Sequence, residues 1–189
     1  RMIIAVFDTE TTGLLLPSTV PIRKQPKIIE LAVAIVKSGK VMKRHTWLIQ
    51  PEIPLPADIT RITGLTDADL KGKPTFAELL PEISKVFKKA DAALAHNASF
   101  DLGMMNNDAV RANGKPFPLP EICLCTVQEY KHLFGFNPSL KVLYEKIMGK
   151  PLAQTHRAMD DVNALIEILL HDQYFSRLEG HWPRCLAGR

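Results

Sequence analysis

The feature that most constrains this chain is an apolar run, Met2 to Phe7, that ends in Asp8-Thr9-Glu10. The run predicts a buried β-strand, in which residues two positions apart point to the same face. Asp8 and Glu10 would then project together, and two carboxylates held so close repel each other unless a counter-charge is present. A divalent cation with oxygen ligands is one such counter-charge. The alternative is a strand that simply ends in a polar turn.

Composition narrows the class of protein. The chain has 189 residues, which suits one domain, and 46% apolar with 23% charged residues is ordinary for a globular protein. No apolar run approaches the roughly 20 residues that span a bilayer, and no secretory pattern is present. The three cysteines lack a zinc-site spacing and predict buried free thiols. We therefore expect a cytoplasmic or nucleoid-associated protein that is neither secreted nor bound to a membrane. The net charge of +4 is compatible with a polyanionic partner without requiring one.

The order of expected elements predicts a mixed α/β domain. Strands at 28–36 and 41–49 would form a hairpin around Ser38-Gly39-Lys40, and a capping-box pattern at Thr75-Phe76-Ala77-Glu78 would start a helix. Further strands are expected at 92–96 and 122–126, and further helices at 58–65, 97–113, 127–134, 139–148 and 157–174. Residues 1–174 would form the domain, and 175–189 a C-terminal tail that is disordered or binds a partner.

A proline-rich loop follows the carboxylate pair. Residues 14–27 exceed the usual loop length and carry Arg23 and Lys24. A loop that contacts phosphates is one interpretation, and a merely solvated loop is the other.

More acidic and imidazole groups stand at suggestive places. Asp101 lies in the first turn of an expected helix, where an anion is favourable in any case, and His156 precedes the last long helix. Helical spacing places Asp161 beside Leu165 and turns Asp160 toward water. An inward carboxylate must be paired or bound to metal, because an unpaired buried charge is too costly. A lysine partner for Asp161 would satisfy the same requirement.

Three segments in series resemble the motifs of one enzyme family. Asp8-Thr9-Glu10-Thr11-Thr12-Gly13, His96-Asn97-Ala98-Ser99-Phe100-Asp101 and His156-Arg157-Ala158-Met159-Asp160-Asp161-Val162 resemble the exonuclease motifs of the DEDDh (DnaQ-like) 3′→5′ exonucleases. The resemblance spans about residues 3–172. It implies a ribonuclease H-like α/β fold, in which helices flank a mixed five-stranded sheet that combines an antiparallel meander with parallel strands.

The resemblance also implies roles for the acidic residues. Asp8, Glu10, Asp101 and Asp161 would hold two Mg²⁺ or Mn²⁺ ions, and His156 would be the general base. Two such ions acidify an attacking water and stabilise the leaving oxygen of a phosphodiester, and histidine titrates in the range suited to take the proton.

Relatives bind the terminal nucleotide with residues that correspond to Gly13, Leu14 and Phe100. Leu14 and Phe100 could equally be ordinary core residues. Many relatives have a histidine where this chain has Thr63, so the role of that position is open. The expected substrate-binding set is Thr9, Gly13, Leu14, Ile62, Thr63, Phe100, Arg23 and Lys24.

The implied function is a two-metal-ion 3′→5′ exonuclease that removes 5′-mononucleotides from single-stranded DNA ends in proofreading or repair. An RNA-trimming or oligoribonucleotide-degrading enzyme has the same chemistry, and the 2′-OH would decide between them. A non-catalytic polymerase-associated or nucleic-acid-binding module is the alternative of another class. The expected partners are 3′ ends of DNA or RNA and a DNA polymerase subunit, and the oligomeric state stays open.

Overall fold

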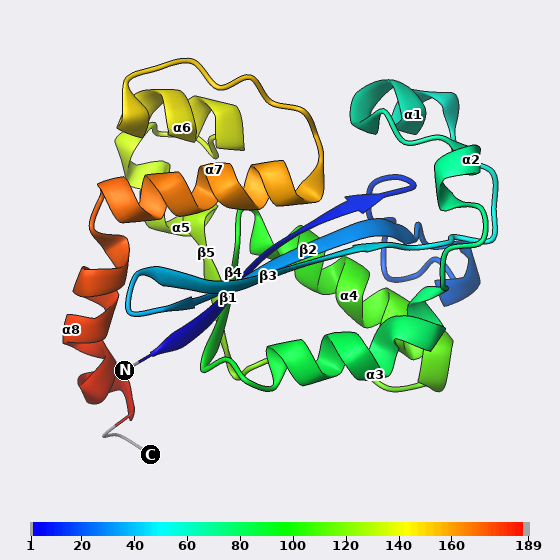
Figure 1. Ribbon diagram of the computed structural model, residues 1–189, viewed down its shortest axis with the longest axis horizontal. Helices are drawn as coiled ribbons and strands as arrows, with labels where there is room; N and C mark the ends of the chain where they lie inside the picture. Colours follow the sequence, from blue (N-terminus) through cyan, green and yellow to red (C-terminus); the bar gives the residue numbers. More distant parts are fainter. Residues whose placement is uncertain (1, 187–189) are drawn as a thin grey trace.

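The fold is a five-stranded sheet covered by helices on both faces (Figure 1). It comes from a computed structural model that describes the backbone of residues 2–186 and the side chains of residues 2–181. The strand order is β3-β2-β1-β4-β5, with β1–β2 and β2–β3 antiparallel and β4 and β5 parallel to β1. Helices α6 and α7 lie on one side of the sheet, and α3 and α4 on the other. This is the mixed sheet that the sequence predicts.

The described elements follow one another in this way. The strands are β1 (Ile3–Thr11), β2 (Ile28–Lys37), β3 (Lys40–Leu48), β4 (Ala92–Ala95) and β5 (Ile122–Cys125). The α-helices are α1 (Ala57–Thr63), α2 (Asp67–Leu70), α3 (Phe76–Phe87), α4 (Ala98–Asn113), α5 (Thr126–Tyr130), α6 (Leu140–Met148), α7 (Ala158–His171) and α8 (Tyr174–Leu186). Two short 3₁₀ helices are η1 (Ile22–Lys24) and η2 (Lys131–Leu133).

Strand β1 is central, and its side chains alternate between two apolar clusters, one on each face of the sheet. Ile4 and Val6 pack into the cluster that includes Val162 and Leu165 of α7. Ala5 and Phe7 pack on the other side, where the Phe7 and Phe87 rings meet edge to face at 5.2 Å. Because side chains alternate along a strand, the even-numbered positions of β1 face α7. Asp8 and Glu10 continue that row beyond the core.

Local signals predicted several elements correctly. The β2–β3 hairpin turns at Ser38 and Gly39, whose φ angles of 48° and 75° are positive as a tight hairpin requires. Thr75 and Glu78 form the capping box that starts α3. Gly114 ends α4 with a φ of 74°.

The C-terminal part differs from the expectation. The helix expected over 157–174 ends at His171, and α8 begins at Tyr174 after Gln173 adopts a φ of 52°. Tyr174 and Phe175 are buried in the core cluster of α7, and Leu178 packs against it. Residues 174–186 are therefore helical in the part of the chain for which we expected a tail that is disordered or binds a partner. Residues 187–189 lie outside the described part of the chain.

The short helix α2 was not predicted. In this region we expected a single helix over 58–65, which corresponds to α1. Similarly, the expected helix over 127–134 is a short α5 followed by η2.

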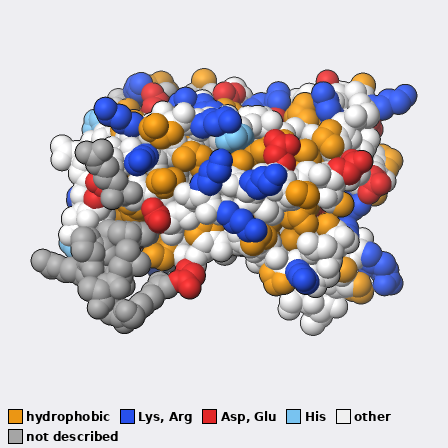
Figure 2. Space-filling model, turned by 60° about the horizontal axis from the view of Figure 1, so that its bottom comes forward, with side chains coloured by type: hydrophobic (Ala, Val, Ile, Leu, Met, Phe, Trp, Pro, Cys, Tyr) orange, Lys and Arg blue, Asp and Glu red, His pale blue; other side chains and the backbone are white. Residues whose placement is uncertain are grey.

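Surface properties agree with a mildly basic protein. On the face in Figure 2, Lys and Arg side chains are spread among apolar and acidic ones. Within the described residues, no helix is long and apolar enough to cross a membrane. Cys123 and Cys125 are free thiols, but Cys123 is exposed and Cys125 half-buried, so the expectation that they are buried is wrong for these two. The side chain of Cys185 lies outside the described residues.

Candidate metal centre

The site begins where β1 extends past its neighbour β4. The β1–β4 pairing includes only Ile4, Val6 and the residue between them, whereas β2 pairs with β1 as far as Thr11. Beyond Val6, one edge of β1 is therefore open to other groups. Asp8 and Glu10 are half-buried on this stretch, on the face that α7 covers.

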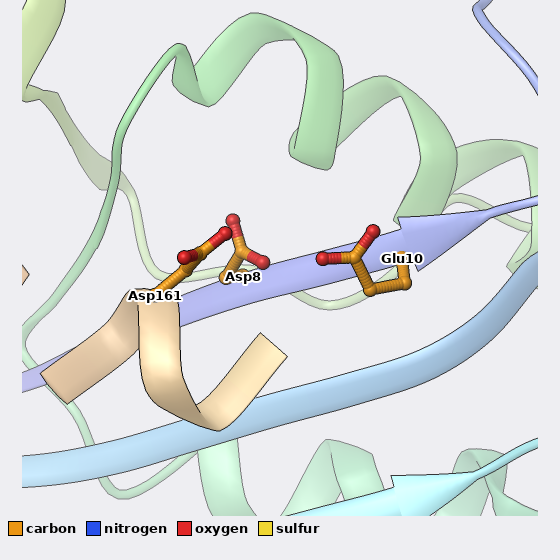
Figure 3. Close-up of side chains that lie close together, drawn as sticks. All are labelled: Asp8, Glu10 and Asp161. Carbon is orange, nitrogen blue, oxygen red and sulfur yellow. The ribbon is translucent and has the colours of Figure 1, made fainter. Parts of the chain in front are cut away.

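Helix α7 supplies the third carboxylate. One oxygen each from Asp8, Glu10 and Asp161 lie within 4.8 Å of one another. Figure 3 shows the Asp161 side chain pointing from α7 toward Asp8, with the Glu10 carboxylate farther along β1. Asp161 is buried whereas Asp160 is exposed, which confirms the predicted phase of the helix.

Asp101 approaches the same place from α4, but it is not one of the three. Its Oδ1 accepts hydrogen bonds from the backbone N–H of Thr9 at 3.1 Å and from the Thr9 hydroxyl at 2.7 Å. The carboxylate therefore satisfies a backbone donor on the edge of β1 that β4 leaves unpaired. Asp101 is 2% exposed, and its charge raises the pKa of Asp8.

Burial and mutual repulsion raise the pKa values of these carboxyls. The pKa of Asp8 is well above its usual range, first because of burial and then because of the charges of Asp101, Glu10, Asp161 and Glu30. Burial and the same kind of repulsion raise the pKa of Glu10 to about 8. Burial raises the pKa of Asp101 to about 7, against the effect of the hydrogen bonds from Thr9. The pKa of Asp161 is raised by burial too.

The donor set fits a hard divalent cation. Carboxylates that repel one another in a buried setting gain from a bound cation, and carboxylate oxygens are the ligands that Mg²⁺ and Mn²⁺ prefer. Gln154 donates from Nε2 to both oxygens of Asp161, at 3.3 and 3.2 Å, which orients that carboxylate. The residues present are thus those that such a centre requires.

His156 lies at the rim of the group. It is exposed, adopts a φ of 52°, and its charge lowers the pKa of Asp161. The imidazole is therefore near the carboxylates and accessible from solvent.

An ion pair that the sequence did not predict lies beside the centre. Glu30 is directly opposite Glu10 in the sheet, is 1% exposed, and binds Arg157. A signal was present, because Glu30 is a charged residue inside the otherwise apolar run Ile28 to Val36. Arg157 itself is part of the third motif, but nothing in the sequence connects it with a residue 127 positions earlier.

The expected substrate-binding residues divide into two groups. Leu14 is 79% exposed and Ile62 is 42% exposed, so both present apolar side chains to solvent, and Gly13 and Phe100 are half-buried. Thr9 and Thr63 are buried. Thr63 donates its hydroxyl to the Ile59 carbonyl at 2.8 Å, and Thr9 donates its hydroxyl to Asp101, so both hydroxyl groups have partners inside the protein.

The loop at 14–27 is held by internal hydrogen bonds. The buried Gln25 side chain accepts from the Leu16 N–H and donates to the Leu16 carbonyl, and Arg111 donates to the carbonyls of Ile22 and Gln25. Arg23 and Lys24 are exposed on η1. The structure describes no contact between these two side chains and the carboxylates.

A mixed sheet in this order, with carboxylates at the end of its central strand, is the arrangement that the resemblance to ribonuclease H-like exonucleases implies. Comparison with known families agrees. A sequence model of the RNase T family, described as exonuclease, matches residues 5–169. The chain belongs to this exonuclease family, which confirms the resemblance to DEDDh enzymes and makes it a nuclease, a hydrolase of nucleic acids.

Individual relatives are consistent with this family. The chain is 33% identical over 165 residues to a DNA polymerase III PolC-type of Clostridium perfringens (strain 13 / Type A), which is 87% of this chain and 11% of that protein. The chain thus spans about a tenth of the length of this polymerase. Among solved structures, it resembles exonuclease X in complex with 5′ overhanging duplex DNA, with a TM-score of 0.62, 25% identity and coverage of 88% and 90% of the two chains. A 3′-exonuclease that recognises the histone mRNA stem-loop shares the fold, with a TM-score of 0.72 and 18% identity over 90% of this chain and 64% of the other.

Proposed function

We propose that the chain is a 3′→5′ exonuclease domain that removes 5′-mononucleotides from single-stranded DNA ends in proofreading or repair. One observation carries the proposal. In a chain of the exonuclease family, Asp8, Glu10 and Asp161 present oxygens within 4.8 Å of one another at the end of the central strand. Such a group suits phosphodiester hydrolysis through the divalent cations that it would hold, because cations stabilise the negative charge that develops on the reacting phosphate.

The carboxylates would hold two Mg²⁺ or Mn²⁺ ions. Asp8, Glu10 and Asp161 are the core of the proposed ligand set, and Asp101 completes it from α4. When bound, such ions acidify an attacking water and stabilise charge on the leaving oxygen. The raised pKa values of Glu10 and Asp101 support this assignment, since a cation would favour their ionised forms.

His156 is the proposed general base. Its imidazole takes a proton from the water that attacks phosphorus, and the bond between phosphorus and the 3′ oxygen breaks. The released nucleotide keeps the phosphate at its 5′ position, and the 3′ oxygen of the shortened strand takes a proton from solvent to become a hydroxyl. The exposure of His156 and its electrostatic interaction with Asp161 support this role.

Apolar side chains would receive the terminal nucleotide. Leu14 and Ile62 are exposed, and with Gly13 and Phe100 they are the proposed contacts for the last base and sugar. Stacking on such side chains tolerates any base, which suits a nuclease without sequence preference. Arg23 and Lys24 are the proposed contacts for phosphates farther along the strand.

A DNA polymerase subunit is the proposed partner. The support is the similarity to a PolC-type polymerase, of which this chain matches a tenth. The same proposal puts the chain in the cytoplasm, where thiols such as Cys123 and Cys125 stay reduced.

The test is an end-labelled degradation assay. Single-stranded DNA and RNA of one sequence, labelled at the 3′ or at the 5′ end, are incubated with the protein and Mg²⁺, Mn²⁺ or EDTA. We expect the 5′-labelled DNA to shorten one nucleotide at a time, the 3′ label to be released as a mononucleotide, and EDTA to stop both. Asp8→Asn protein, purified in the same way, controls for contaminating nucleases.

Three results would contradict the proposal in different ways. Faster shortening of RNA than of DNA would favour an RNA-trimming enzyme. First release of the 5′ label would overturn the polarity. A well-folded protein that leaves every substrate intact in either metal would identify a non-catalytic module instead.

A further inference from the structure

Glu30 is an almost fully buried carboxylate near the centre. It is 1% exposed, yet it stands in a strand of apolar residues and directly opposite Glu10, which has the same charge. Like charges facing each other across two strands are destabilising, and a buried charge needs a partner. Arg157 is that partner: its Nε lies 3.2 and 3.1 Å from the two Glu30 oxygens, and its Nη2 donates to Oε2 at 2.6 Å. This two-pronged contact fixes the guanidinium plane relative to the sheet.

Glu30 also caps helix α7. The residue at the N-cap position of α7 is Arg157, and its side chain makes no capping hydrogen bond. Instead, the Ala158 N–H at the start of the helix donates to Glu30 Oε1 at 2.7 Å. A carboxylate at a helix N-terminus is favoured both by the free N–H group and by the helix dipole. Glu30 of β2 therefore binds both the side chain of Arg157 and the first turn of α7, the helix that carries Asp161.

The backbone of Arg157 connects this anchor to the two functional residues. Its carbonyl accepts the N–H of Asp161 at 3.1 Å, the first hydrogen bond of α7. On its other side is His156, whose φ of 52° is unfavourable for a residue with a side chain and persists only where the surroundings impose it.

We infer that the Glu30–Arg157 ion pair is a positioning device that fixes Asp161 and His156 relative to Asp8 and Glu10. The inference rests on the proposed function, since it assigns the pair to that same centre. Neither residue is a catalytic residue here, because their side chains bind each other and the helix. The two residues are 127 positions apart in the sequence, and their contact joins the start of α7 to β2.

A simpler role for Arg157 must be separated from this one. Its positive charge lowers the pKa of Glu10. The alternative is therefore that Arg157 offsets negative charge at the centre and positions nothing. Lysine keeps the charge but cannot form the two parallel hydrogen bonds of a guanidinium. Arg157→Lys therefore separates positioning from charge compensation.

The experiment compares wild type with Arg157→Lys, Glu30→Gln and the double variant. We measure kcat and KM on 5′-labelled DNA, and independently the affinity for Mn²⁺ by calorimetry without substrate. We expect each single variant to lose about 10–100-fold in kcat with KM within about twofold, and to bind Mn²⁺ more weakly, as when a residue that supports metal ligands is lost. The double variant should lose no more than the worse single variant, because the two residues act as one unit. All measurements are made well below the melting temperature of each variant.

Arg177→Lys is the matched control. Arg177 pairs with Asp172 at 2.6 Å, at the other end of α7, and we expect its kcat and Mn²⁺ affinity to stay within about twofold of wild type. If Arg157→Lys keeps wild-type kcat and Mn²⁺ affinity, or if Arg177→Lys loses as much, the inference is wrong. If wild type itself cleaves nothing, the proposed function has failed, and the Mn²⁺ affinities alone then decide on positioning.

Discussion

Asp8→Asn is expected to abolish cleavage, with a loss of at least about 10³-fold in kcat, while the protein stays folded. Asp8 lies between Glu10 and Asp161 in the group of carboxylates, so an amide in its place removes a ligand from the middle of the proposed centre. Metal ions contribute several kcal/mol to reactions of this kind, and each 1.36 kcal/mol corresponds to a factor of ten. The assay is degradation of 5′-labelled DNA at saturating Mg²⁺.

The same variant should stabilise the metal-free protein. Because the pKa of Asp8 is raised in the folded state, the folded protein binds this proton more tightly than the unfolded chain, and stability falls as the group ionises with rising pH. Wild type in EDTA should therefore lose stability between about pH 4 and pH 8, the range over which Glu10 and Asp101 also ionise. At pH 8, Asp8→Asn should melt roughly 2–4 °C higher than wild type, the shift for about 1 kcal/mol in a domain of this size. At pH 4 the difference should vanish. A variant that melts lower at pH 8 would show that the carboxylates do not repel one another.

Asp161→Asn and Asp160→Asn should differ by at least about 100-fold in activity, although the two residues are neighbours. Asp161 is 8% exposed and belongs to the carboxylate group, whereas Asp160 is exposed and accepts a hydrogen bond from Thr155 at 2.6 Å. Loss of a ligand should reduce kcat by about 10³-fold, and loss of an exposed charge by no more than about threefold. The measurement is kcat for both variants in the same preparation conditions.

Each of these two variants is the control for the other, since both exchange aspartate for asparagine in the first turn of α7. Circular dichroism would establish that both are folded. An equal loss of activity in the two would mean that the exposed residue contributes as much as the buried one, and the proposed ligand set would have to be redrawn.

Local patterns in the sequence were sufficient for much of the fold. The alternation from Ile4 to Glu10 set the face of the first two carboxylates, because the period of a strand is two residues. The helical period separated Asp161 from Asp160 in the same way. The Ser38-Gly39 turn and the Thr75–Glu78 capping box marked their elements, because the hydrogen bonds or backbone angles involved are local.

Contacts between distant segments could not be predicted in this way. The sequence at the start of α7 contains no capping side chain, and Glu30 of strand β2 caps the helix instead. The hydrogen bonds between Thr9 and Asp101 were not predicted either, since they depend on β4 ending early and leaving that edge of β1 open. Gln173 separates α7 from α8 with a positive φ, and a glycine, the usual sequence signal for such a backbone angle, is absent at this position. In retrospect, the spacing of Tyr174 and Leu178 was a helical signal for α8.

The central claim is that acidic side chains from β1 and α7 bind divalent ions together. Anomalous diffraction from crystals soaked in Mn²⁺ tests it most directly, because the scattering identifies the metal and its ligands at once. We expect two Mn²⁺ peaks in contact with Asp8, Glu10 and Asp161, with Asp101 at one of them, and no such peaks in Asp8→Asn crystals. Saturating Mn²⁺ that binds elsewhere and leaves these carboxylates without a peak would contradict it.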